Sequence, residues 1–305
     1  MKIVVSSIFF SLLVCLFYFE GIAQKEVAIT LDDLPSSQQI NNNSTSRVLL
    51  QQINSLEIPV TIFINEVNVD SPEKHKILSE WLRNPLITPG NHTFNHLRCS
   101  SVPVDSFLYE VRRGEGITKK LAEKSGKKLI YFRFPYNDLG KDSVSQNMVK
   151  NGLKKLGYTI APFTVESSDW MFNAVYRRLY KKGKLDSARM IGERYIERTL
   201  EYFKYFEEIS RSEYGRQIPQ IYLGHDNLIN SHFLADLIQK LAHRGYSFIR
   251  LEEAMQDKIF DQTNHYHEKW GISWIYRWMS DPQKRREYMK NEPDLRMIRD
   301  LYGNR

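Results

Sequence analysis

The sequence predicts an α/β protein built on a parallel β-sheet. Short runs rich in β-branched and aromatic residues alternate along the chain with longer stretches whose apolar residues recur at helical spacing. Repeated alternation of this kind favours parallel strands joined by helices, arranged as an open doubly wound sheet or as a barrel. Periodicity does not decide between these two arrangements.

The predicted elements follow one another over residues 26–251. Strands are expected at 26–31, 58–64, 129–132, 163–165, 220–223 and 246–249. Helices are expected at 47–56, 73–83, 105–124, 142–156 and 233–244. Because no internal repeat and no linker rich in Gly or Pro divides the sequence, we expect one main domain, residues 24–251, with elaborations.

Two segments depart from this alternation. A long, charged and aromatic stretch at about residues 171–217 is predicted to be a helical insertion or an enlarged crossover, whose Tyr and Phe stripe packs against the domain. Residues 252–305, which carry three Trp residues among many charges, are predicted to form a C-terminal helical extension.

The N-terminus has the layout of a secretory signal peptide. Lys2 precedes an uncharged apolar run over residues 3–19, and small residues follow up to Ala23, which predicts a removable leader of residues 1–23. The alternative is an uncleaved membrane anchor, since the run is at the short edge of a membrane span. We therefore expect an exported protein, periplasmic or extracellular, with no membrane span once the leader is cleaved.

Composition excludes several classes of protein and partner. With 305 residues, 42% of them hydrophobic and 26% charged, the chain is neither collagen-like, nor of low complexity, nor a disulfide scaffold. Cleavage of the leader would leave Cys99 alone, so no intrachain disulfide is expected. The net charge of +7 arises from basic residues scattered among acidic ones, which makes nucleic acid the weakest candidate partner. We infer no protein partner.

Five short motifs lie near the C-terminal ends of predicted strands, where α/β barrels assemble their active sites. In chain order they are 30–35 (TLDDLP), 90–96 (GNHTFNH), 132–136 (FRFPY), 166–170 (ESSDW) and 222–226 (YLGHD). In the first motif, neighbouring side chains of a regular strand face opposite ways. Asp32 and Asp33 can therefore reach one site only if the strand ends there, as Pro35 indicates.

The second motif places two histidines four residues apart. If the segment is helical, His92 and His96 share one face, and that spacing allows two imidazoles to bind one metal ion. With a carboxylate from the first motif they form a two-His, one-Asp set that leaves coordination positions open, as catalytic metal sites do. Each of these residues has a commoner structural role when taken singly, so the catalytic interpretation depends on their joint occurrence.

Taken together, the five motifs resemble, in content and order, those of the polysaccharide deacetylase family, carbohydrate esterase family 4 with a NodB homology domain. The resemblance implies a distorted (β/α) barrel as the catalytic domain. It implies a metal-dependent hydrolase acting on carbon–nitrogen bonds other than peptide bonds, which removes N-acetyl and also O-acetyl groups from a carbohydrate. Two alternatives stay open: the same chemistry on a small non-sugar amide or ester, and a non-catalytic carbohydrate-binding envelope protein.

The resemblance also implies a ligand set and a base. Asp33, His92 and His96 would hold a divalent metal, zinc first, with cobalt, nickel, manganese and iron as alternatives. Asp32 would be the general base that takes a proton from the attacking water. Arg133 would pair with Asp32 and hold it ionised and oriented, because a nearby positive charge favours the carboxylate form.

The remaining implied roles concern the leaving group and the acyl group. His225 would be the general acid that protonates the leaving amine, and Asp169 would keep its imidazole protonated. The backbone N–H of Tyr136 would help to stabilise the oxyanion. Trp170 and Leu223 would wall the acyl pocket.

The sequence departs from the family pattern in two respects. The family's first motif commonly reads Thr-Phe-Asp-Asp-Gly, whereas Leu31 and Leu34 stand here in place of Phe and Gly, and a bulky Leu34 beside a metal ligand is a candidate for reshaping the entrance. The insertion and the C-terminal extension have no counterpart in the core homology domain, and both are candidates for covering or narrowing the substrate groove.

Overall fold

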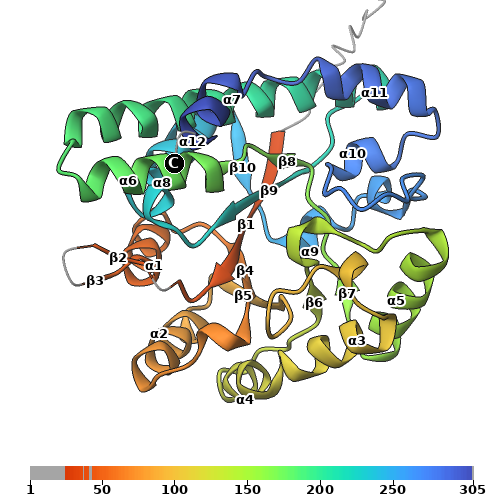
Figure 1. Ribbon diagram of the computed structural model, residues 1–305, viewed down its shortest axis with the longest axis horizontal. Coiled ribbons are helices and arrows are strands. Elements are labelled where there is room, and N and C mark those ends of the chain that lie inside the picture. The colour runs from red at the N-terminus through yellow and green to blue at the C-terminus, as the bar shows by residue number, and fades with distance from the viewer. Residues whose placement is uncertain (1–24, 37, 41–42, 304–305) are drawn as a thin grey trace, which may run out of the picture.

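Eight parallel strands form one curled sheet surrounded by helices (Figure 1). The computed structural model describes residues 25–36, 38–40 and 43–303. The strand order is β7-β6-β5-β4-β1-β9-β8, and β10 pairs with the first residues of β1. Within the described residues no ladder joins β7 to β8, so the barrel is open along one side. The predicted α/β class is confirmed, and the arrangement is the distorted barrel rather than a flat open sheet.

Six of the main strands overlap predicted runs. The main sheet contains β1 (Lys25–Leu34), β4 (Val60–Ile64), β5 (Ile87–Asn91), β6 (Tyr131–Phe132), β7 (Thr159–Ile160), β8 (Val165–Glu166), β9 (Gln220–His225) and β10 (Tyr246–Phe248). A separate antiparallel pair consists of β2 (Gln39–Ile40) and β3 (Asn43–Ser44). Strand β5 was not predicted because Pro89 and Gly90 interrupt its β-rich character. Gly90 is required there, since a Cβ atom would collide with the ring of Phe63.

The helices surround the sheet in chain order. They are α1 (Thr45–Leu56), α2 (Pro72–Arg83), α3 (Val104–Arg113), α4 (Gly116–Lys124), α5 (Ser143–Lys155), α6 (Asp169–Lys181), α7 (Leu185–Tyr214), α8 (Leu228–His243), α9 (Leu251–Ala254), α10 (Trp274–Arg277), α11 (Pro282–Lys290) and α12 (Arg296–Gly303). Single 3-10 turns lie at Glu66–Asn68, Cys99–Ser101, Pro135–Asn137 and Lys258–Asp261.

The single helix predicted at 105–124 is wrong, because the chain forms two helices, α3 and α4, separated at Gly114. A Cβ atom at this position would lie 2.5 Å from the carbonyl carbon of Thr93. The break therefore lets the end of α3 approach the backbone of the loop that carries both histidines of the second motif. Phe94 N–H donates to the carbonyl oxygen of Glu110 in α3, which fixes the same contact from the other side.

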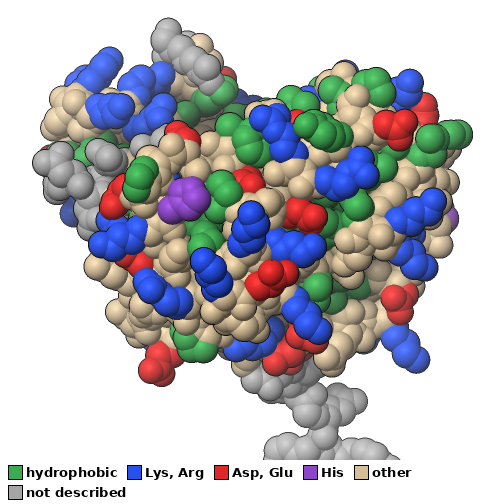
Figure 2. All heavy atoms as spheres, turned by 90° about the horizontal axis from the view of Figure 1, so that it is seen from below, with side chains coloured by type: hydrophobic (Ala, Val, Ile, Leu, Met, Phe, Trp, Pro, Cys, Tyr) green, Lys and Arg blue, Asp and Glu red, His purple; other side chains and the backbone are tan. Residues whose placement is uncertain are grey.

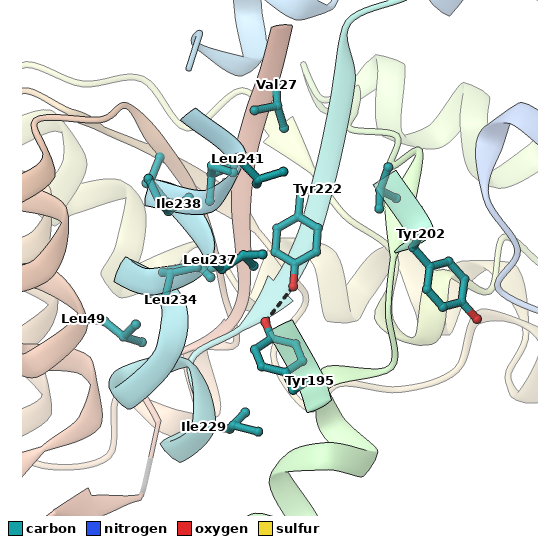
Figure 3. Close-up of a cluster of buried hydrophobic side chains, with 14 of the residues drawn as sticks. Val27, Leu49, Tyr195, Tyr202, Tyr222, Ile229, Leu234, Leu237, Ile238 and Leu241 are labelled. Carbon is teal, nitrogen blue, oxygen red and sulfur yellow. Dashed lines mark hydrogen bonds between the residues drawn. The ribbon is translucent and has the colours of Figure 1, made fainter. Parts of the chain in front are cut away.

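The main core lies between the sheet and helices α1, α7 and α8. Figure 3 shows apolar side chains from these elements around β1 and β9, with the hydroxyl groups of Tyr195 and Tyr222 hydrogen-bonded at 2.7 Å in their midst. Helix α7 accounts for one side of this core, since its buried aromatic residues pack against β9. Strand β1 is buried over most of its length because it lies in the middle of the sheet with helices on its faces.

The surface bears mixed charges. Figure 2 shows one face on which Lys and Arg side chains are interspersed with Asp and Glu rather than gathered in one patch. Among the described residues no helix has the length and apolarity needed to cross a membrane. The predicted signal peptide, residues 1–23, lies outside the described residues.

The close approach at Gly114 leads to a stability prediction. We expect Gly114→Ala to lower the free energy of unfolding by about 1–3 kcal/mol. The added methyl group would collide with backbone atoms of Thr93 and Phe94, which cannot move aside as a flexible side chain can. Urea unfolding monitored by circular dichroism measures this. Gly303→Ala in α12 is the matched control, since nothing lies within 4 Å of a Cβ atom there. Equal stability of the two variants would contradict the role of Gly114.

Candidate active site

The C-terminal ends of the strands surround a cleft of about 1130 Å³. Of the ten residues predicted to form the site, eight line this cleft: Asp32, Asp33, His92, His96, Tyr136, Trp170, Leu223 and His225. The other two, Arg133 and Asp169, are fully buried next to them. The fold thus brings all five sequence motifs together, as their positions after strands predicted.

The two carboxylates at the end of β1 face the same cleft because the strand loses its regular geometry there. Asp32 is still paired in register with His225 of β9, whereas Asp33 has a left-handed backbone with φ of 68°. The pairing with β4 shifts between Leu31 and Leu34, which marks the same irregularity. Asp32 is buried and Asp33 is partly exposed, so the two groups have different environments although they are adjacent in sequence.

The segment that carries His92 and His96 is a loop, so the helical condition for a shared face is not met. The rings nevertheless converge, with centroids 5.0 Å apart, because Thr93 and His96 have left-handed backbones with φ of 65° and 57°. The hydroxyl of Thr93 accepts a hydrogen bond from the N–H of His96 at 3.1 Å. The left-handed turns at Thr93 and His96 therefore bring the two imidazole rings together, as a helix would have done.

Asp33, His92 and His96 form a cluster that fits a divalent metal ion. Asp33 Oδ1 lies 3.6 Å from His92 Nε2 and 3.4 Å from His96 Nε2. His92 Nδ1 lies 2.8 Å from the carbonyl oxygen of Arg133 and donates its proton there, which leaves Nε2 with a free lone pair. Burial lowers the pKa of His92 well below its ordinary value, so the ring is neutral. Asp33 Oδ1 is buried without a hydrogen-bond partner, as a metal ligand would be.

A buried guanidinium group faces the second carboxylate. Arg133 Nη1 lies 3.7 Å from Asp32 Oδ2, a distance typical of an ion pair without a direct hydrogen bond. The remaining guanidinium nitrogens donate to the carbonyl oxygens of Ala161 and Pro162 and to the hydroxyl of Thr30. Burial raises the pKa of Asp32 to about 6, although Arg133 acts to lower it. The carboxyl group is therefore poised to exchange a proton near neutral pH.

A second charged pair lies on the β9 side of the cleft. His225 Nδ1 lies 2.6 Å from Asp169 Oδ1, at the N-terminus of α6. Burial acts to lower the pKa of His225, but the charge and hydrogen bond of Asp169 outweigh it and raise the pKa to about 10. The ring is therefore protonated at neutral pH, with its Nε2–H free to face the cleft.

Sequence reasoning missed the groups that hold Asp169 in place. Asn227 and Asn230 each donate a side-chain N–H to Asp169 Oδ2, at 2.8 and 2.7 Å. Tyr195 of α7 in turn donates to the side-chain oxygen of Asn230 at 2.6 Å. An available signal was the N-cap of α8, since Asn227 immediately precedes the helix and its side chain accepts from the N–H of Asn230.

Tyr136 is placed beside the metal-binding cluster. Its ring meets that of His96 edge-on, with centroids 4.5 Å apart, and the guanidinium of Arg98 lies 3.9 Å above the ring. The backbone of Tyr136 is left-handed, with φ of 57°. The phenol is half-exposed and lines the cleft.

The two residues predicted to wall the acyl pocket, Trp170 and Leu223, both line the cleft, Trp170 as an exposed side chain and Leu223 as a buried one. Leu34, which was a candidate for reshaping the entrance, does not do so. Its side chain is fully buried in the main core and does not line the cleft. The irregularity at Asp33 explains this, because it turns the following side chain away from the site.

Comparison with known proteins agrees with this geometry. The family model described as polysaccharide deacetylase matches residues 21–161, which include Asp32, Asp33, His92, His96 and Arg133. Residues 21–161 of the chain are thus similar to the polysaccharide deacetylase family. It is 25% identical over 240 residues to YheN of Bacillus subtilis (strain 168), which is named as a polysaccharide deacetylase, and the match covers 77% of this chain and 70% of YheN. Both similarities agree with the predicted enzyme class, a hydrolase of carbon–nitrogen bonds in acetyl amides.

Solved structures share the fold at low sequence identity. A mutant of a CE4 family pseudoenzyme with restored enzymatic activity has a TM-score of 0.53 at 17% identity, covering 77% of this chain and 68% of that one. The wild-type pseudoenzyme, from Bacillus anthracis, has a TM-score of 0.51 at 15% identity, covering 77% and 66%. A peptidoglycan N-acetylglucosamine deacetylase has a TM-score of 0.52 at 18% identity, covering 77% and 90%.

The cluster at the end of β1 leads to a prediction about metal retention. We expect His92→Ala to lower bound zinc at least about tenfold, because it removes one of three ligand atoms. Elemental analysis after dialysis against a weak chelator measures this. His243→Ala, an exposed histidine at the end of α8, is the matched control and should retain the metal. Full metal content in the His92 variant would refute the ligand assignment.

Proposed function

We propose that the protein is a metal-dependent deacetylase that removes acetyl groups from an N-acetylated carbohydrate, with O-acetyl groups as further substrates. One observation carries the proposal: a two-His, one-Asp cluster shares an open cleft with a buried carboxyl, Asp32, and with the imidazole of His225, whose pKa is raised. The carboxyl and the imidazole belong to residues paired in register on neighbouring strands. A base and an acid beside a metal site are the groups that hydrolysis of an amide requires.

Asp33, His92 and His96 would hold the metal. When bound, a divalent ion at this site supplies Lewis acidity, which polarises the amide carbonyl and acidifies water. Two imidazole nitrogens and one carboxylate oxygen with open positions suit zinc first, and also cobalt, nickel, manganese or iron.

Asp32 and His225 would move the protons. Asp32 takes a proton from the attacking water as the oxygen–carbon bond forms, and Arg133 keeps the carboxylate oriented. His225 gives its proton to the leaving nitrogen as the carbon–nitrogen bond breaks, because an amide anion is a very poor leaving group. Asp169 stabilises the protonated imidazole at 2.6 Å. The N–H of Tyr136 would stabilise the oxyanion, and Trp170 and Leu223 would wall the acetyl group.

Pseudoenzymes among the structural neighbours make catalytic competence a specific question for this chain. A pseudoenzyme lacks a group that the chemistry needs, whereas here the proposed base, the ligand cluster and the proposed acid line one cleft, and the orienting cation, Arg133, is buried next to it. This complete set favours catalysis over the non-catalytic binding alternative.

We also propose that the protein acts outside the cytoplasmic membrane. The support is the sequence of residues 1–23, which has the layout of a signal peptide. An acetylated envelope or extracellular carbohydrate is therefore the substrate that we would test first.

The first test of the proposal is acetate release. We expect the zinc-loaded protein to release acetate from N-acetylglucosamine oligomers, and Asp32→Asn or His225→Ala to lower kcat by about 10²- to 10⁴-fold, because each removes one proton transfer. Asp236→Asn and His243→Ala, exposed in α8, are matched controls. Absence of acetate release with zinc, cobalt, nickel, manganese and iron, from a folded protein, would contradict the proposal. Release from a small ester only would favour the non-sugar alternative.

The pKa values lead to a prediction about pH dependence. Activity should fall as the pH drops through about 6, where Asp32 becomes protonated, and as it rises through about 10, where His225 loses its proton. A bound cation lowers both limits, because it favours the less protonated form of each group. Asp169→Asn should move the alkaline limit to lower pH, since the anion that raises the pKa of His225 is lost. An alkaline limit unmoved by Asp169→Asn would count against His225 as the acid.

A further inference from the structure

The C-terminal extension reaches the cleft in the segment just before α10. Trp270 and Gly271 both line the cleft, next to Tyr136 and Asn137. Gly271 packs so closely on the carbonyl oxygen of Tyr136 that a Cβ atom would collide with it. A segment outside the core homology domain is thus in contact with the residue that borders the metal-binding cluster.

A buried arginine holds this segment in place. The guanidinium of Arg277, which is fully buried, donates to the carbonyl oxygens of Asn137 at 3.2 Å, Trp270 at 3.0 Å and Tyr266 at 3.2 Å. Ser273 additionally donates its hydroxyl proton to the carbonyl oxygen of Thr164, in the connection between β7 and β8. Because these contacts fix the backbone on both sides of Trp270, its position in the cleft is built into the fold.

The Trp270 side chain is 57% exposed, although the backbone beneath it is firmly held. The Nζ atom of the neighbouring Lys269 lies over the indole, 5.1 Å from the ring centroid. A large aromatic side chain held exposed on a rigid backbone, in a cleft with polar walls, is suited to bind a ligand that has both an apolar face and hydroxyl groups.

The end of the extension reaches the cleft a second time, through α12. Arg299 and Tyr302 line the cleft, and the ring of Tyr302 meets that of Trp170 edge-on with centroids 5.4 Å apart. Figure 1 shows α10 and α12 on opposite sides of the central strands. The extension therefore contributes residues to the cleft from two separate directions.

We propose that the C-terminal extension supplies sugar-binding subsites beside the catalytic centre, with Trp270 as a stacking platform for one pyranose ring. This inference rests on the proposed function and deepens it. The substrate class is an oligosaccharide of several N-acetylated sugars rather than a single acetylated sugar. The C–H face of a pyranose stacks on an indole ring, whose π face carries partial negative charge, while the sugar hydroxyls remain available to polar groups. A cleft of about 1130 Å³ is large for one acetylated sugar and accommodates more than one ring.

Binding and turnover of N-acetylglucosamine oligomers of two, four and six sugars test this proposal. We expect Trp270→Ala to raise Kd and KM for the hexamer about 5- to 10-fold, as loss of one aromatic contact implies, and to affect the dimer less. Trp270→Phe should retain most of the affinity, because it keeps an aromatic face. Tyr109→Ala in α3 is the matched control, since Tyr109 is 58% exposed and lies outside the cleft.

The outcomes separate this inference from the proposed function. Kd is measured by calorimetry on the zinc-loaded protein and does not require turnover. Failure to release acetate would therefore contradict the proposed function, whereas the binding measurement would still test the role of Trp270. A hexamer that binds the Trp270→Ala variant and the wild type equally well would overturn the inference. A wild type that fails to bind the hexamer at millimolar concentration would also overturn it.

Discussion

The site depends above all on one buried arginine. The guanidinium of Arg133 faces Asp32 and donates to the carbonyl oxygens of residues 161 and 162, in the open side of the barrel. Its own carbonyl oxygen accepts from His92 Nδ1, which fixes the ring nitrogen that faces Asp33. One residue therefore orients both the proposed base, Asp32, and a proposed metal ligand, His92. Desolvation of a guanidinium is costly, and it is tolerated here because a carboxylate and backbone carbonyls surround the charge.

Backbone conformation gathers the remaining groups. Seven non-glycine residues among those described have positive φ, and six of them border the site: Asp33, Thr93, His96, Tyr136, Asn137 and Ser168. A left-handed backbone is unfavourable for residues with a Cβ atom, and such positions persist where the surrounding fold enforces them. Here the left-handed turns direct side chains from the ends of strands and from loops toward one point. Three of these six residues, Asp33, His96 and Tyr136, have a role in the proposed chemistry.

The sequence predicted the class of fold and the residues that the fold brings to the cleft. Both predictions depend on patterns of residue types along the chain. Apolar alternation marked β1 and β9, and the motifs after the strands marked Asp32 and His225. Conformation was harder to predict. The spacing of His92 and His96 would give a shared face only on a helix, whereas the positive φ angles of the actual loop depend on contacts with α3 that no local pattern encodes. The support that α7 gives to Asp169 through Asn230 could likewise not be predicted from the sequence. Tyr195 and Asn230 are far apart along the chain, and neither belongs to one of the five motifs.

The central claim is that one metal ion per chain, held by Asp33, His92 and His96, makes the cleft a deacetylase. The most direct measurement is acetate release from N-acetylglucosamine oligomers by chelator-treated protein during stepwise addition of zinc. The account predicts no release before addition, a linear rise, and saturation near one zinc per chain. Release that is unaffected by removal of the metal would contradict the account, as would a fully loaded protein that releases no acetate.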